Sequence, residues 1–159
     1  MNLTLICMGR LKENYLKAAC AEYQKRLNGF CRFTVEELEA EKLPSDPSQA
    51  EIAAALEKEG ERILRRIPRN AYTAALCIEG KELGSEELAR LMESVPVLGS
   101  GAAVFIIGSS YGLSDKVKSA AQLKLSMSKM TFPHQLARVM LMEQIYRAYS
   151  IINNRSYHK

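Results

Sequence analysis

The sequence is poor in the residues that usually mark a metal site or a disulfide framework. Its 159 residues include no tryptophan, two histidines and four cysteines. The cysteines are far apart and form no CxxC pair, which argues against a zinc site and against disulfide bonds. All of them lie in apolar surroundings, which is typical of reduced core cysteines. They are Cys7, Cys20, Cys31 and Cys77.

A leader segment and an uninterrupted apolar segment are also missing. Residues 1–15 lack the charged leader and the small-residue cleavage site of a signal peptide. The most apolar stretch, 136–152, contains Arg138, Glu143 and Arg147, and charges inside a membrane span are costly. We therefore expect a cytoplasmic protein with no membrane segment. A composition of 47% hydrophobic and 25% charged residues, without repeats or linkers, predicts one globular domain over residues 1–159.

Positive charge is modest overall but concentrated near the C-terminus. The net charge is +4, whereas residues 116–159 carry eight cations and one acid, Glu143, and hence +7. Such a local excess suits a polyanion such as nucleic acid. Lysines that only keep a surface soluble would give the same composition, so both interpretations stay open at this point. The cations are Lys116, Lys118, Lys124, Lys129, Arg138, Arg147, Arg155 and Lys159.

Strand and helix patterns alternate along the whole chain. Short apolar runs predict strands at 3–8, 33–38, 72–78, 102–107 and 123–127. Helical spacing predicts helices at 16–27, 48–67, 85–95 and 114–121, the second starting with a capping box of Ser48 and Glu51 and the third ending at Pro96. This alternation is typical of an α/β domain with a mostly parallel sheet and helices on both faces.

The segment 126–152 joins a polar loop to a long helix that begins near Gln135. The helix is apolar nearly all round, so it must be buried on more than one side. A large core or a second subunit would cover it.

Three distinctive loops follow the last three predicted strands, at 79–84, 108–112 and 126–134. Ligands of open α/β sheets bind beyond the carboxyl ends of the strands, and Gly80, Gly108 and Gly112 allow positive φ and close approach of a ligand. Any one of these glycines is more often a simple turn residue, but three loops on one edge predict a pocket rich in free backbone groups. The loops match no dinucleotide fingerprint, P-loop or serine nucleophile elbow. His134, after a proline at a helix start, is expected to be a cap or core residue.

The C-terminal motifs resemble those of the RlmH family, small SPOUT-class methyltransferases of the large ribosomal subunit. The resemblance is carried by SxSxMTxPH at 126–134, by RV and EQxYRA between 138 and 148, and by the ending YHK at 157–159. It runs end to end, because the first strand with Gly9, the Lys58-Glu59-Gly60-Glu61 helix turn, Gly80-Lys81 and the Gly108 loop follow in order.

The resemblance implies a specific activity and architecture. Family members transfer a methyl group from S-adenosylmethionine to N3 of a pseudouridine in helix 69 of 23S rRNA, use no metal, contain a C-terminal trefoil knot and act as homodimers. By position, it implies that the cofactor is bound by Leu76, Gly108, Met127, Ser128, Lys129, Met130, Thr131 and Phe132. Family members usually have two adjacent glycines where this chain has Gly108-Ser109. If the second position needs positive φ, serine there is strained by about 1 kcal/mol or more.

The resemblance also directs attention to three catalytic candidates. We expect Arg138 to orient phosphate or base, and Tyr157 and His158 of the tail to act at the reacting base, His158 as proton acceptor or base contact that reaches the partner subunit's cofactor. A frayed, inactive tail is the alternative for His158. Two other functions stay open, a knotted methyltransferase of tRNA and a non-catalytic RNA-binding module. The predicted phosphate contacts are Lys116, Lys118, Lys124 and Lys129.

Overall fold

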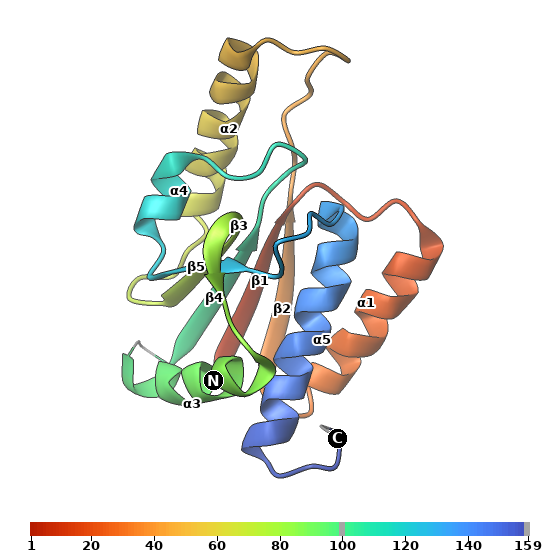
Figure 1. Ribbon diagram of the computed structural model, residues 1–159, viewed down its shortest axis with the longest axis vertical. Helices are drawn as coiled ribbons and strands as arrows, with labels where there is room; N and C mark the ends of the chain where they lie inside the picture. The colour runs from red at the N-terminus through yellow and green to blue at the C-terminus, as the bar shows by residue number, and fades with distance from the viewer. Residues whose placement is uncertain (99–100, 158–159) are drawn as a thin grey trace.

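The fold is a single parallel sheet with helices on both faces (Figure 1). The computed structural model describes residues 1–98 and 101–157. Five strands pair in the order β2-β1-β4-β3-β5, and every pairing is parallel. The strands are β1 (Asn2–Met8), β2 (Arg32–Leu38), β3 (Tyr72–Glu82), β4 (Ala102–Ile107) and β5 (Leu123–Ser126). The α/β prediction is confirmed.

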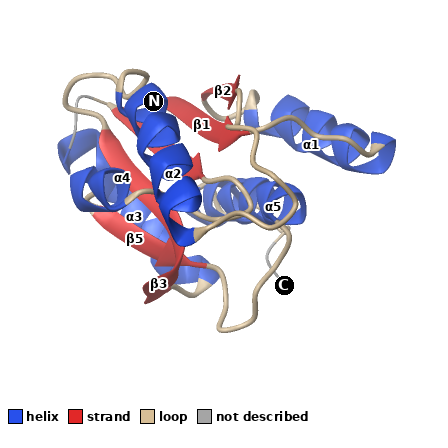
Figure 2. Cartoon of the chain, turned by 90° about the horizontal axis from the view of Figure 1, so that it is seen from above, coloured by secondary structure: helices blue, strands red, loops and turns tan. Residues whose placement is uncertain are grey.

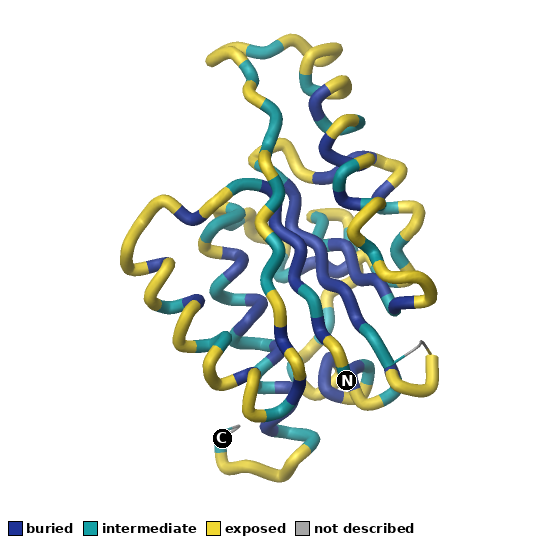
Figure 3. The backbone as a smooth tube through the Cα atoms, turned by 180° about the vertical axis from the view of Figure 1, so that it is seen from behind, coloured by how far each residue is buried: buried dark blue, intermediate teal, exposed yellow. Residues whose placement is uncertain are grey.

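The helices divide into two layers (Figures 1 and 2). One face of the sheet packs against α1 (Asn14–Leu27), α3 (Ser85–Leu98) and α5 (His134–Ile152), which form the larger apolar cluster. The other face packs against α2 (Gln49–Leu64) and α4 (Asp115–Ala120), which form the smaller cluster. The central strands β1 and β4 are buried between the layers (Figure 3).

Helix α5 is covered from two sides, as its apolar composition predicts. It lies on the sheet between α1 and α3, and it contacts both helices. Leu141, Met142 and Ile145 are completely buried there. Leu136 remains 39% exposed and Met140 half-buried, so the first half of the helix keeps an apolar face that one chain does not cover.

Most boundaries agree with the sequence, with three exceptions. Helix α2 starts with the predicted capping box but ends at Leu64, three residues before the expected end. Helix α3 continues through Pro96 to Leu98, because a proline in the last turn removes few helical hydrogen bonds. Strand β3 continues to Glu82, so 79–82 belongs to a strand and not to a loop.

The extension of β3 contains a bulge that Gly80 makes possible. Leu125 of β5 pairs with both Leu76 and Lys81, so the residues between them are extra in β3. A Cβ on Gly80 would lie 2.6 Å from the Leu125 carbonyl carbon. Gly80 therefore allows β5 to pack closely against β3. The sequence suggested a positive φ for Gly80, but its φ is not positive.

The cysteine prediction is confirmed for three residues. Cys7, Cys20 and Cys31 are free and buried, and Cys77 is free and half-buried. Within 1–98 and 101–157, no helix is long and apolar enough to cross a membrane. The trefoil knot stays a prediction.

Candidate functional site

A cavity of about 790 Å³ lies at the carboxyl ends of β3, β4 and β5. Its walls come from residues 76–79 of β3, the 108–113 loop and the 126–134 loop. The second and third loops singled out in the sequence therefore meet there, whereas Glu79 alone of the first segment, 79–84, lines the cavity. All residues predicted to bind the cofactor line this cavity except Lys129, whose side chain is exposed. Those lining it are Leu76, Gly108, Met127, Ser128, Met130, Thr131 and Phe132.

The 108–112 loop folds tightly back on itself. The Gly112 N–H donates to the Ser109 carbonyl at 2.9 Å, and Gly112 has φ +88°. A Cβ on Gly108 would lie 2.2 Å from the Gly112 carbonyl oxygen, so only glycine fits at 108. Ser109 does not have positive φ, and the strain considered for serine at this position is absent.

The 126–131 loop is held by its own serines. The Ser126 hydroxyl donates to the Ser128 carbonyl at 3.0 Å, and the Ser128 hydroxyl accepts from the Met130 N–H at 3.0 Å. Met130 is 74% exposed at the cavity rim. The loop therefore presents backbone groups in a fixed arrangement.

His134 lines the cavity, in contrast to the expected cap or core position. The helix N-cap is Pro133, and no side chain caps it. Burial, followed by the charges of Arg138 and Lys12, lowers the pKa of His134 below its ordinary 6.5. The imidazole is therefore neutral at pH 7 and can accept a proton.

One wall of the cavity carries an ion pair. Lys118 Nζ lies 2.5 Å from Glu79 Oε1, and this bond raises the pKa of Lys118 and lowers that of Glu79. Next to it, burial and then the charge of Glu79 raise the pKa of the Cys77 thiol. The wall is polar but has no net charge.

The catalytic candidates are dispersed. Arg138 is 2% exposed, and its guanidinium donates to Glu37 Oε1 at 2.5 Å and to the Gly9 carbonyl at 3.0 Å. It thus holds the ends of β1 and β2, and it does not line the cavity. Tyr157 lies near the other end of α5, and His158 lies outside the described residues.

The tail packs back on α5 through aromatic contacts. The Tyr157 ring lies edge-on to Tyr146 with centroids 4.8 Å apart and beneath the Arg147 guanidinium at 4.9 Å. The Tyr157 hydroxyl donates to Glu143 Oε1 at 3.3 Å. Helix α5 starts near the middle of the molecule, and it ends at the lower edge of the view in Figure 1.

Much of the C-terminal charge excess is neutralised locally. Lys116 pairs with Glu57 and Arg147 with Glu143, in addition to the pairs of Lys118 and Arg138. Lys124 and Lys129 are exposed and form no ion pair within the described chain. Lys129 lies within the 126–134 loop, and Lys124 lies in β5 just before it.

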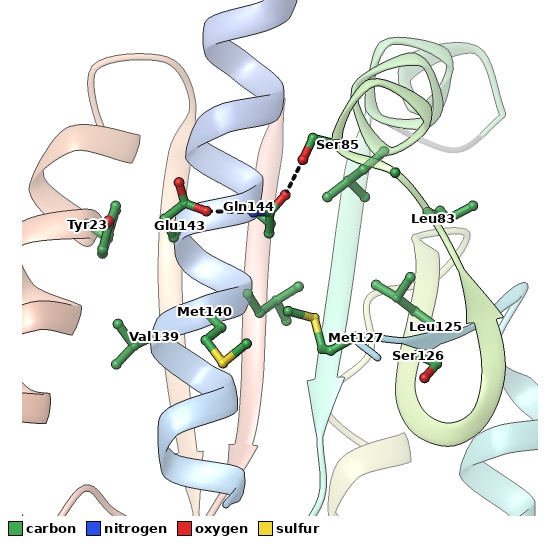
Figure 4. A pocket seen from close by; sticks show the side chains of 13 residues that line it. Tyr23, Leu83, Ser85, Leu125, Ser126, Met127, Val139, Met140, Glu143 and Gln144 are labelled. Carbon is green, nitrogen blue, oxygen red and sulfur yellow. Dashed lines mark hydrogen bonds between the residues drawn. The ribbon is translucent and has the colours of Figure 1, made fainter. Parts of the chain in front are cut away.

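A second cavity of about 490 Å³ lies beside α5, with walls from α1, α3 and the 126–127 turn (Figure 4). Val139 and Met140 of α5 face it together with Met127 and Leu83. At its upper side the Ser85 hydroxyl donates to Gln144 Oε1 at 2.7 Å. Met140 of the uncovered apolar face of α5 thus lines this cavity, whereas Leu136 does not.

The sequence interpretation missed one buried acid, Glu59, which is 3% exposed. Its signal was present in α2, because Glu59 is four residues from both Ala55 and Ile63, which are buried. Among the described residues, no group of three or more His, Cys, Asp or Glu is arranged to hold a metal ion.

Comparison with known proteins agrees with this geometry. Residues 1–158 match a family model described as a predicted SPOUT methyltransferase. The Ribosomal RNA large subunit methyltransferase H of Clostridioides difficile (strain 630) is 48% identical over 159 residues, and that of Clostridium kluyveri is 47% identical, each over 100% of both chains. The chain belongs to the RlmH family of SPOUT methyltransferases.

Solved structures similar to this RlmH-family chain support the fold alone. A probable methylase family protein from Haemophilus influenzae matches 99% of this chain and 70% of its own with TM-score 0.54 and 12% identity. A tRNA (m1G37) methyltransferase from Aquifex aeolicus matches 92% of this chain and 70% of its own with TM-score 0.55 and 10% identity. SPOUT-class methyltransferases use S-adenosylmethionine, so the family membership implies this methyl donor.

Proposed function

We propose that this RlmH-family chain methylates N3 of a pseudouridine in helix 69 of 23S rRNA, with S-adenosylmethionine as donor. The observation that carries the proposal is the cavity of about 790 Å³ between β3 and the 108–113 and 126–134 loops. Two relatives named as ribosomal RNA large subunit methyltransferases match the whole chain at 47–48% identity, which supports the proposal. We further propose that residues 1–159 work as one domain.

The cavity fits the donor on the basis of its own walls. Gly108 keeps the floor free of side chains, and the apolar residues Leu76 and Phe132 lie beside backbone groups of the 126–131 loop. Apolar walls suit an adenine ring, and fixed backbone amides and carbonyls suit its polar edge. When bound there, S-adenosylmethionine supplies an electrophilic methyl group.

The chain's residues must position the base and remove one proton. The N3 atom of pseudouridine carries a proton at neutral pH, so a group must accept it while nearby cations stabilise the developing charge. We propose His158 of the partner subunit's tail for this role, and the neutral imidazole of His134 is a second acceptor within the cavity wall. Alignment of nitrogen, methyl carbon and sulfur is mainly a matter of positioning.

Two chains complete one site in this proposal. Helix α5 has 19 residues and is therefore about 28 Å long, which separates the cavity at its start from Tyr157 beyond its end. The tail of one chain therefore cannot reach its own cavity along α5. We propose a homodimer in which the uncovered face of α5 meets its partner and each tail reaches the other chain's cofactor.

Arg138 acts through the backbone in this proposal. Because its guanidinium is occupied by Glu37 and Gly9, it orients the base by fixing the 9–12 segment. The Lys12 N–H of this segment donates to Gln135 Oε1 at 2.9 Å, beside His134 of the cavity wall. Lys124 and Lys129 are the lysines free to contact phosphate, and such contacts make the rate fall as salt rises.

The test is calorimetric titration with S-adenosylmethionine, followed by a methylation assay on assembled ribosomes. Wild type should bind, and Gly108→Ala should lose binding because its Cβ would displace the Gly112 carbonyl. Gly29→Ala, on an exposed turn far from the cavity, is the matched control and should bind normally.

Two results would contradict the proposal at different levels. Methylation of tRNA and not of ribosomes would retain the enzyme class and replace the substrate. Absence of donor binding both with and without ribosomes would leave an RNA-binding module and remove catalysis.

A further inference from the structure

The Lys58–Glu61 turn of α2 takes no part in the proposed transfer, yet it contains a buried carboxylate. Glu59 Oε1 accepts from the backbone N–H of Glu41 at 2.9 Å, and Glu59 Oε2 accepts from the Ser109 hydroxyl at 2.8 Å. Burial of a carboxylate is unfavourable unless its oxygens are hydrogen-bonded. Each oxygen of Glu59 has such a partner, and each partner belongs to a different loop.

The bond from Ser109 connects α2 to the wall of the methyl-donor cavity. Ser109 belongs to the 108–112 loop, whose backbone lines the cavity. The loop turns through Gly112 at φ +88° and is closed by one hydrogen bond between Gly112 and Ser109. Glu59 adds a fixed point from the helix layer to this short turn.

The next residue of α2 fixes the other end of the same segment. A Cβ on Gly60 would lie 2.3 Å from the Ser114 hydroxyl oxygen, so the helix backbone lies directly against Ser114. Ser114 in turn caps α4 by accepting from the Val117 N–H. Adjacent residues of α2 thus contact both Ser109 and Ser114.

The same helix face also holds the chain that leaves β2. The Arg62 guanidinium donates to the Glu39 carbonyl at 2.7 Å and pairs with the Glu41 carboxylate. A small cavity of about 110 Å³ lies between this chain and the 109–111 loop. Helix α2 therefore contacts both the chain that leaves β2 and the loop that lines the donor cavity.

We propose that Glu59 is a positioning residue for the methyl donor, which acts through the Ser109 hydroxyl to hold the 108–112 loop in its binding conformation. A loop that is already ordered does not lose conformational entropy when ligand binds, so the bond strengthens binding without touching the donor. The inference rests on the proposed function, because it assumes that S-adenosylmethionine occupies this cavity.

The sharpest variant is Ser109→Ala, which removes one hydroxyl and leaves the turn intact. We expect the Kd for S-adenosylmethionine to rise about tenfold, the size of one hydrogen bond to a charged group. Calorimetry is run well below the melting temperature of each variant that folds, so that weaker binding does not reflect unfolding. Hydrogen exchange of amides 109–112 should quicken. Ser119→Ala, an exposed serine on α4, is the control and should bind as wild type does.

A double-mutant cycle shows whether Glu59 acts through Ser109. Glu59→Ala should weaken binding, and Ser109→Ala should add nothing in that background. Glu59→Gln keeps an acceptor oxygen and should restore part of the affinity. Glu61→Gln, exposed on the same helix, is the matched control.

The outcomes separate the inference from the function. Wild-type affinity in both Ser109→Ala and Glu59→Ala, even with a lower melting temperature, would overturn the inference and leave the proposed function intact. Failure of the wild type to bind would overturn the proposed function and the inference with it. If Glu59→Ala does not fold, Ser109→Ala and Glu59→Gln decide the question alone.

Discussion

At the scale of single residues, the glycines of one loop have different tasks. Gly112 needs its positive φ, so Gly112→Ala should lower the free energy of unfolding by about 1 kcal/mol. Gly108→Ala should lower it by about 3 kcal/mol, because its Cβ overlaps a backbone oxygen that cannot turn away. Urea denaturation measures both, and equal losses would contradict this distinction.

His134 links stability to pH. Its folded pKa is lowered from 6.5, so the folded state resists the proton that the unfolded state accepts. The contribution of His134 to the free energy of unfolding is fully present above about pH 6.5, and it is lost as the pH falls through the lowered pKa of the folded state. The free energy of unfolding should therefore decrease on acidification below 6.5.

His134→Gln isolates this effect, because glutamine does not titrate in this range. The variant should show a shallower decrease of unfolding free energy than the wild type over the same pH interval. Identical slopes would show that other groups cause the decrease.

Cys77 provides a chemical probe of the donor cavity. It is half-buried in the cavity wall, whereas Cys7, Cys20 and Cys31 are buried in the core. A thiol reagent should modify Cys77 before the other cysteines of the native protein. The reaction should be slow because the pKa of the Cys77 thiol is raised, and bound S-adenosylmethionine should slow the modification further. Mass spectrometry after brief labelling identifies the modified residue, and labelling that the donor leaves unchanged would contradict the assigned cavity.

At the scale of elements, the capping box of α2 fixes where that helix begins. The Ser48 hydroxyl accepts from the Glu51 N–H at 3.2 Å, and the Glu51 carboxylate accepts from the Ser48 N–H at 2.8 Å. Ser48→Ala should lower the free energy of unfolding by about 1 kcal/mol. Ser45→Ala, exposed in the preceding loop, should leave it unchanged in the same denaturation experiment.

The elements also show what local sequence can predict. Apolar runs and caps predicted the strands and helices, because those signals lie within each segment. The pairing of Leu5 with Phe105 and the bulge of β3 depend on residues distant in sequence, so neither was predictable. Gly80 looked like a ligand-facing glycine, and only the position of β5 shows its actual role.

The site was predictable in part for the same reason. Strand ends placed the 108–112 and 126–134 loops at one edge, which predicted the donor cavity without knowledge of strand order. The prediction was wrong for 79–84, of which only Glu79 lines the cavity. The burial of Arg138 depends on Glu37 of β2, and the connection of Glu59 to Ser109 joins residues 50 positions apart. Such contacts follow from the assembled fold, and one sequence does not indicate them.

At the scale of the whole molecule, the uncovered face of α5 predicts an association. Met140→Glu places a charge in the second cavity beside Met127 and Val139, where a partner would bury it. The variant should be monomeric and lose methylation while it retains its fold, as measured by sedimentation and circular dichroism. Ser119→Glu, exposed on α4 at the other face of the sheet, changes the charge by the same amount and is the control. A Met140→Glu protein that still sediments as a dimer would contradict the assigned interface.

Mixed dimers would show whether each site uses two chains. A Gly108→Ala chain is expected not to bind the donor, and a chain that ends at residue 156 lacks the tail. Neither should be active alone, yet each mixed dimer contains one complete site. An equal mixture should therefore regain about a quarter of wild-type activity.

The place of α5 in the core has a consequence for biosynthesis. This helix follows the other described elements in the chain but fills the middle of the larger apolar cluster, between α1 and α3. Until residues 134–152 leave the ribosome, α1 and α3 can pack on the sheet but lack the helix that lies between them. The larger cluster therefore stays incomplete until then, and a product truncated before 134 should be degraded rather than accumulate as a partial enzyme.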